Sequence, residues 1–186
     1  KALPTVKVTP LPAFAPALFP EFLDIWEASI CGEPTKQALI FQILTMTRPA
    51  ESYGARWEEI DIDNALWNIP AERMKAKQLH RVPLAPRAIA LLENMRGLHS
   101  ELVFPSPRAQ VPVSDTTLTM FLRRAEAPST TEGRYATAHG FRSSFRDWCS
   151  EQGYARDLAE RALAHSIQNQ VEAAYHRTDL LDQRRP

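Results

Sequence analysis

The pattern of apolar and polar residues predicts a mainly helical chain that is interrupted once by short strands. Apolar side chains recur at helical spacing in residues 21–29, 86–98, 114–127 and 155–163. Residues 35–46 are apolar almost all round, which is typical of a central buried helix. Three short runs bounded by turn residues, 56–62, 65–70 and 79–84, predict a small antiparallel sheet. The predicted fold class is therefore α+β, mainly α-helical, with a three-stranded antiparallel sheet.

A further helix is predicted to begin near His139 and to end at Gly153. Its apolar stripe, which we expect to face the core, is formed by Phe141, Phe145, Trp148 and Cys149. His139, Arg142 and Arg146 share a different side of this helix, because residues three and four apart are neighbours. His165 follows the next predicted helix and lies at a junction.

Four residues in the last third of the chain form a pattern with a chemical meaning. Taken singly, a histidine or tyrosine beside an apolar stripe is more often structural than catalytic. The chain nevertheless combines His139-x-x-Arg142, then Leu-x-His165, then Tyr175 followed by basic residues. This combination resembles the tyrosine recombinases, the phage-integrase family. The segments TAHGFRSSFRDWCSEQG and VEAAYHR are most similar to integrases of prophages and genomic islands that resemble the satellite-phage integrases.

Two earlier segments extend the resemblance. TMTRPAE, residues 45–51, resembles the first arginine motif of the family, with Arg48 and a carboxylate, Glu51, three residues later. The glycine that usually precedes this arginine is replaced. Arg-Met-Lys followed by His-x-Val-Pro-Leu resembles the hairpin that holds the family's catalytic lysine. Lys75 matches that lysine, and Lys77 is the second candidate.

The resemblance implies cleavage of a phosphodiester through a covalent 3′-phosphotyrosyl intermediate, with Tyr175 as nucleophile. Arg48 and Arg142 would bind the negative charge on the phosphate, because a planar guanidinium offers paired donors. His165 would add a hydrogen bond. His139 would act as base, oriented by Glu51, and Lys75 would protonate the leaving 5′-oxygen. No cofactor is expected, because the phosphotyrosyl bond conserves the energy of the bond that is cleaved.

Composition changes this picture in two respects. The net charge of zero argues mildly against nucleic-acid binding, but residues 73–87 contain five basic and no acidic side chains. Arg73, Lys77, Arg81 and Arg146 are therefore predicted to contact DNA. The two cysteines and five histidines lack metal-binding spacing, so no metal is expected.

The chain is predicted to hold one catalytic domain, residues 21–186, after a proline-rich linker, residues 1–20. The amino-terminal DNA-binding domains that precede such a linker in the family are expected to be missing from this fragment. The expected partner is double-stranded DNA with attachment sites, bound as a homotetramer on synapsed duplexes, and the isolated fragment is expected to be a monomer. No apolar run is long enough to cross a membrane. The resemblance implies a bacterial cytoplasmic, nucleoid-associated protein.

Two alternatives remain open, of which the first keeps this fold and the second shares this chemistry. One is a catalytically silent DNA-binding module, although all six catalytic positions carry competent residue types. The other is a strand cleavage and religation activity like that of type IB topoisomerases, which would relax supercoiled DNA without site preference. A metallohydrolase is disfavoured by the spacing of the histidines.

Overall fold

The computed structural model describes residues 12–107, 111–165 and 178–185. The described helices are α1 Phe19–Ala28, α2 Glu33–Thr45, α3 Pro49–Tyr53, α4 Pro86–Met95, α5 Asp115–Arg124, α6 Gly140–Glu151 and α7 Arg156–Ala162. The strands are β1 Ile60–Asp61, β2 Leu66–Ile69 and β3 His80–Pro83, and the short 3-10 turns are η1 Pro16–Leu18, η2 Trp57–Glu59, η3 Ala71–Arg73 and η4 Asp182–Arg184. The predicted α+β, mainly helical class with one small sheet is confirmed.

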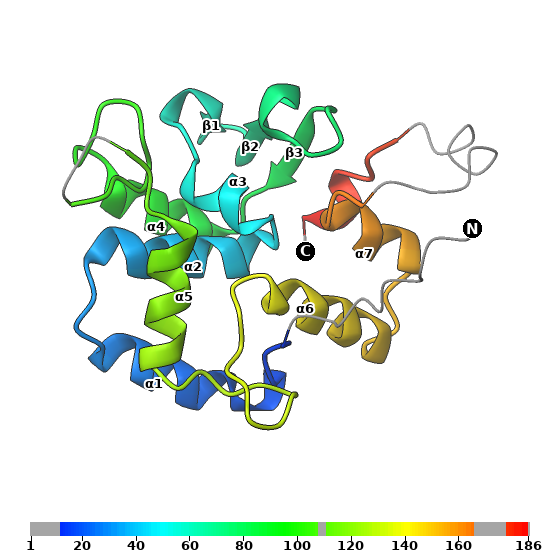
Figure 1. Ribbon diagram of the computed structural model, residues 1–186. Coiled ribbons are helices and arrows are strands. Elements are labelled where there is room, and N and C mark those ends of the chain that lie inside the picture. The colour runs from blue at the N-terminus through cyan, green and yellow to red at the C-terminus, as the bar shows by residue number, and fades with distance from the viewer. Residues whose placement is uncertain (1–11, 108–110, 166–177, 186) are drawn as a thin grey trace, which may run out of the picture.

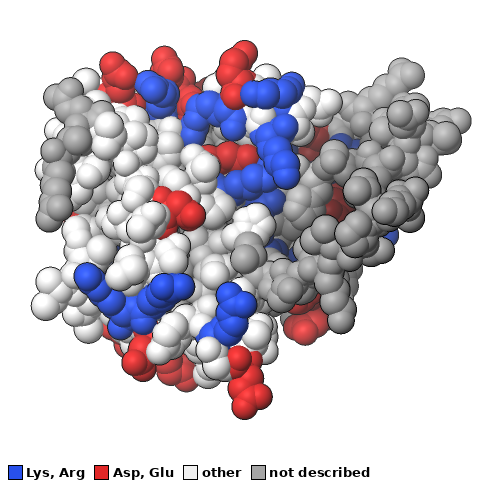
Figure 2. All heavy atoms as spheres, in the orientation of Figure 1, with Lys and Arg blue, Asp and Glu red and all other residues white. Residues whose placement is uncertain are grey.

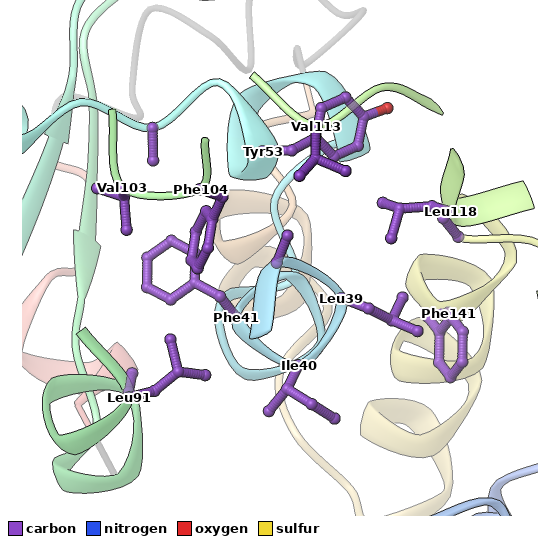
Figure 3. Packing of buried hydrophobic residues seen from close by; sticks show 14 of the residues in the cluster. Leu39, Ile40, Phe41, Tyr53, Leu91, Val103, Phe104, Val113, Leu118 and Phe141 are labelled. Carbon is purple, nitrogen blue, oxygen red and sulfur yellow. The ribbon is translucent and has the colours of Figure 1, made fainter. Parts of the chain in front are cut away.

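Helix α2 forms the centre of the molecule, as its all-round apolar sequence predicted. It contacts α3, α4 and α5, and Figure 1 shows α5 crossing in front of it with the sheet on one side and α6 and α7 to the right. Phe41, on α2, packs against Trp67 and Phe104 with ring centroids 5.0 and 5.4 Å apart. On the other side of α2, Leu39 points toward Leu118 and Phe141 (Figure 3). The core therefore joins the sheet to the C-terminal helices through α2.

The sheet has the order β1-β2-β3 with both pairs antiparallel. Alternate residues of β2, Trp67 and Ile69, are fully buried, which is the pattern of a strand with one face on the core. The indole nitrogen of Trp67 donates a 2.9 Å hydrogen bond to the buried carboxylate of Glu59. Arg73, in η3, forms an ion pair with the same carboxylate. This pair ties the loop before β3 to the sheet.

Part of the predicted linker is packed into the core. Phe14 is 2% exposed and stacks on Phe141 with centroids 4.8 Å apart and ring planes 14° apart. The hydroxyl of Ser144 donates a 2.6 Å hydrogen bond to the carbonyl of Phe14. The segment from Pro12 to Phe14 therefore lies directly on α6. The domain boundary at residue 20 stays a prediction, but the buried body of the protein includes residues before it.

The apolar stripe predicted for α6 is only partly correct. Phe141 and Cys149 are buried, whereas Phe145 is half-buried and Trp148 is 41% exposed. Trp148 instead contacts Tyr154, which is also exposed, with ring centroids 5.4 Å apart. Arg142, which was not part of the predicted stripe, is buried. The side of α6 that carries Phe145 and Trp148 is therefore less covered than the side that carries Phe141 and Cys149.

Within the described ranges, no helix is long and apolar enough to cross a membrane.

Candidate active site

Arg48 is held by Glu51 through two separate hydrogen bonds. Arg48 is the N-cap residue of α3, and its backbone N–H donates to Glu51 Oε2 at 2.9 Å. Its guanidinium Nη1 donates to Glu51 Oε1, also at 2.9 Å. Glu51 is only 3% exposed, so its charge is well matched by the arginine beside it. In the described part of the chain, the side-chain hydrogen bonds of Glu51 go to Arg48, and the role predicted for Glu51 toward His139 stays a prediction.

Met46 and Thr47 stand before Arg48 where a glycine was expected, and Met46 adopts the backbone that glycine favours. It is the C-cap of α2 with φ 50° and ψ 23°, in the left-handed region. This turn points the Met46 carbonyl toward α6, where it accepts a hydrogen bond from Arg142 Nη1. The left-handed turn thus ends α2 and helps to hold the second predicted arginine.

His165 is placed by the C-terminus of α7. Ala164 is left-handed, with φ 48°, and its N–H donates to the carbonyl of Arg161 at 3.0 Å. The N–H of His165 donates to the carbonyl of Glu160 at 2.9 Å. These two bonds define a Schellman motif, which turns the chain back over the last helical turn. The His165 side chain therefore lies against α7 and α6 rather than continuing along the helix axis.

Arg48, Arg142 and His165 meet at this turn. Arg48 Nη2 donates to the carbonyl of Ala164 at 3.2 Å, and Arg142 Nη2 donates to the carbonyl of Leu163 at 2.5 Å. Arg142 Nη2 also lies 3.3 Å from His165 Nε2. Three residues that are up to 117 positions apart in the sequence therefore form one cationic cluster. Such a cluster has the donors and charge that bind a phosphodiester.

The pKa values of two neighbouring groups reflect this concentration of positive charge. Burial, and then the charge of Arg48, lowers the pKa of Arg142 to about 10, and Glu51 opposes that shift. Partial burial, and then the charges of Arg142 and Arg48, lowers the pKa of His139. His139 precedes α6 and stays open to solvent. A lowered pKa keeps its imidazole unprotonated at neutral pH, as a proton acceptor must be.

The two predicted lysines lie on the surface and make none of the contacts of this cluster. Lys75 is exposed in the loop between η3 and β3. Lys77, in the same loop, is exposed with φ 53°, and its Nζ donates to the carbonyl of Glu72 at 3.1 Å. Figure 2 shows Lys and Arg side chains gathered over the upper part of one face, down to its centre, with acidic side chains among them. These lysines are thus available to a ligand on the surface.

The three predicted DNA-binding arginines all have partners within the protein. Arg73 is turned inward, toward Glu59 and the carbonyl of Glu51, which leaves its guanidinium engaged. Arg81 binds Asp179 through two hydrogen bonds of 2.8 and 3.0 Å. Arg146 Nε lies 2.6 Å from Glu160 Oε1. Arg81 and Arg146 remain more than 40% exposed, and the DNA contacts of all three stay predictions.

The predicted nucleophile, Tyr175, lies outside the described residues. It follows His165 by ten positions, and the described chain resumes at Thr178. Among the described residues, no group of three or more His, Cys, Asp or Glu side chains is placed to hold a metal ion.

Two acidic residues that the sequence analysis did not single out support the cluster. Glu160, on α7, contacts both His165 and Arg146, each at 2.6 Å. Glu59 pairs with Arg73, which in turn donates a 2.7 Å hydrogen bond to the carbonyl of Glu51. No local sequence signal marks Glu59. Glu160 precedes His165 by five positions, which is the spacing that a Schellman turn brings together.

Known proteins match the chain over nearly its whole length. The phage integrase family matches residues 18–180. The chain belongs to the phage integrase family. It is 38% identical over 179 residues to prophage integrase IntA of Escherichia coli strain K12, which covers 95% of this chain and 42% of IntA. It is 37% identical over 201 residues to the integrase of Enterobacteria phage P4, which covers 99% of this chain and 45% of that protein.

The fold is shared with solved structures of the same kind. The crystal structure of XerH site-specific recombinase bound to difH substrate, a pre-cleavage complex, superposes with a TM-score of 0.69 at 17% identity, over 91% of this chain and 54% of XerH. This likeness supports the fold alone. The chain spans less than half the length of the two curated relatives. The predicted resemblance to prophage and satellite-phage integrases is confirmed, and what the complete protein does is a matter for proposal.

Proposed function

We propose that this chain is the catalytic domain of a site-specific DNA recombinase, which cleaves and rejoins DNA strands during integration or excision of a mobile element. The observation that carries the proposal is the meeting of Arg48, Arg142 and His165 at the end of α7. The family match over residues 18–180 supports the same conclusion.

The reaction follows from these residues. Arg48 and Arg142 bind the non-bridging oxygens of the scissile phosphate, where negative charge grows during displacement. Tyr175 attacks phosphorus, His139 accepts its proton, and the 3′-phosphate becomes bound to the tyrosine. Lys75 protonates the leaving 5′-oxygen when its loop meets DNA. A 5′-hydroxyl from a second strand then reverses the step, which joins the exchanged strands.

The partner in this proposal is double-stranded DNA in the bacterial cytoplasm. Residues 21–186 form the catalytic domain, amino-terminal DNA-binding domains precede it in the complete protein, and four protomers act together on two duplexes. The DNA contacts are made by four side chains that reach the surface: Lys75, Lys77 and the exposed parts of Arg81 and Arg146.

The test is covalent attachment to a nicked duplex that carries the end sequence of the host element. We expect the parent chain to give a protein–DNA band on a denaturing gel and Tyr175→Phe to give none, because only the nucleophilic oxygen is removed. A gel-shift experiment measures binding in parallel. An attachment band that persists in Tyr175→Phe would remove this tyrosine from the mechanism. Binding without attachment by the parent would identify a silent binding module, and relaxation of supercoiled plasmid without site preference would identify a topoisomerase.

A further inference from the structure

Glu160 joins His165, a member of the cationic cluster, to Arg146, which lies outside it. Neither group has another acidic contact among the hydrogen bonds and ion pairs of the described residues. Glu160 Oε2 lies 2.6 Å from His165 Nδ1, and Glu160 Oε1 lies 2.6 Å from Arg146 Nε. The carboxylate is 21% exposed, whereas the two partners are 40% and 44% exposed. Glu160 is thus the inner member of this trio.

The backbone fixes the distance between Glu160 and His165. In the Schellman motif that ends α7, Glu160 and His165 occupy the two positions whose side chains meet, and an apolar pair commonly fills them. Here a carboxylate and an imidazole fill them. Because the His165 N–H also binds the Glu160 carbonyl at 2.9 Å, the two residues are joined by main-chain and side-chain hydrogen bonds together.

Both side-chain contacts of the His165 imidazole require the same tautomer of the neutral ring. Arg142 Nη2 can only donate, so His165 Nε2, 3.3 Å away, must accept and carry no proton. The proton of the neutral ring then lies on Nδ1, where Glu160 Oε2 accepts it. Burial raises the pKa of Glu160, but the hydrogen bond from His165 and the charge of Arg146 lower it more, so this carboxyl is ionised and able to accept.

We infer that Glu160 is a positioning residue for His165, which keeps the proton on Nδ1 and turns Nε2 toward the phosphate bound by Arg48 and Arg142. Arg146 holds the second oxygen of the carboxylate and so fixes its direction. A hydrogen bond from Nε2 to a phosphate oxygen requires a proton on that nitrogen, and the carboxylate of Glu160 at Nδ1 is placed to stabilise the imidazolium that would carry it. This role rests on the proposed function, while the contact itself does not.

Nitrogen-15 NMR of the chain labelled at histidine tests the contact without any DNA, with the His165 signals assigned from His165→Gln. The neutral parent should show the Nδ1–H tautomer at His165. Glu160→Ala should raise the population of the Nε2–H tautomer that free imidazole favours, because only the 3.3 Å contact with Arg142 then opposes that tautomer. A matched control is Glu101→Ala, which removes an exposed carboxylate that pairs with Arg56 at 3.0 Å. It should leave His165 unchanged. An Nε2–H tautomer in the parent, or no change in Glu160→Ala, would overturn the inference.

The rate of covalent attachment to the nicked duplex tests the role. We expect Glu160→Ala to slow attachment about 10–100-fold, by analogy with the loss found when a group that orients a metal-bound histidine is removed. Glu160→Asp should recover part of that loss, because it restores a carboxylate. An attachment rate equal to that of the parent in Glu160→Ala would refute the role in catalysis. If the parent itself forms no covalent complex, the proposed function fails, and the NMR comparison still decides whether Glu160 sets the tautomer.

Discussion

The substitution Gly140→Ala tests how the N-terminal segment packs on α6. A methyl group at Gly140 would overlap the carbonyl oxygen of Pro12 and come within 2.9 Å of its carbonyl carbon and 3.1 Å of the Cα of Ala13. All of these atoms belong to the backbone, so no side chain can turn away to relieve the overlap. The segment from Pro12 to Phe14 would have to move.

The expected change in stability can be worked from these contacts. Alanine in place of a helical glycine normally stabilises by about 0.5–1 kcal/mol. Overlap in a packed region costs about 1–3 kcal/mol, and a weakened hydrogen bond adds about 1 kcal/mol. The bonds at risk run from Ser144 to the Phe14 carbonyl at 2.6 Å and from the Thr137 N–H to the Pro12 carbonyl at 3.3 Å. We expect a net loss of about 2 kcal/mol.

Urea unfolding followed by circular dichroism measures this loss, and a loss of that size lowers the melting temperature of a chain of this length by about 4–8 °C. The matched control is Gly32→Ala, because its methyl would lie 3.6 Å from the nearest heavy atom, Pro107 Cγ, with ordinary backbone angles. It should lower stability by less than about 1 kcal/mol, because Gly32 is the N-cap of α2 and alanine caps a helix less well than glycine. A Gly140→Ala variant as stable as the parent, or more stable, would refute the proposed packing of the N-terminal segment.

Two further predictions concern the core and the buried imidazole. Phe41→Ala should lower the free energy of unfolding by about 3–5 kcal/mol in urea titration, because this ring is fully buried between Trp67 and Phe104. A loss under about 1 kcal/mol would contradict that packing. Burial, and then the charge of Arg184, lowers the pKa of His80 to about 4 from 6.5. The unfolded chain therefore binds the extra proton between these pH values, so stability falls by about 3 kcal/mol from pH 6.5 to 4. His80→Asn should flatten this slope, and an unchanged slope would exclude His80 as its source.

Local patterns were enough to predict most of the elements. Ser114 caps α5 by accepting a 3.2 Å hydrogen bond from the Thr117 N–H, and Gly153, with φ 76°, follows the end of α6. The alternation along β2 places Trp67 in the core, as a half-buried strand requires. These features depend on neighbours within a few residues, so periodicity and turn chemistry are sufficient to find them.

The candidate site was predictable as a set of residue types but not as a geometry. Arg48, Arg142 and His165 were identified from motifs, and the structure brings them together. The role of Tyr175 still rests on the sequence and the family. The replacement of a glycine by Met46 left the turn before Arg48 open, and only the folded chain shows that methionine takes the left-handed conformation there.

Taken alone, the sequence determined the fold class, the helices and strands, and the family's characteristic residues. Tertiary structure decided which charged side chains meet and which aromatic side chains are buried. Arg73 turned inward to Glu59, Glu160 met His165, and Phe14 entered the core, whereas Trp148 reached the surface. The reason is physical. Local propensity acts over one or two helical turns, but burial and the pairing of buried charges depend on which distant segment happens to cover a residue.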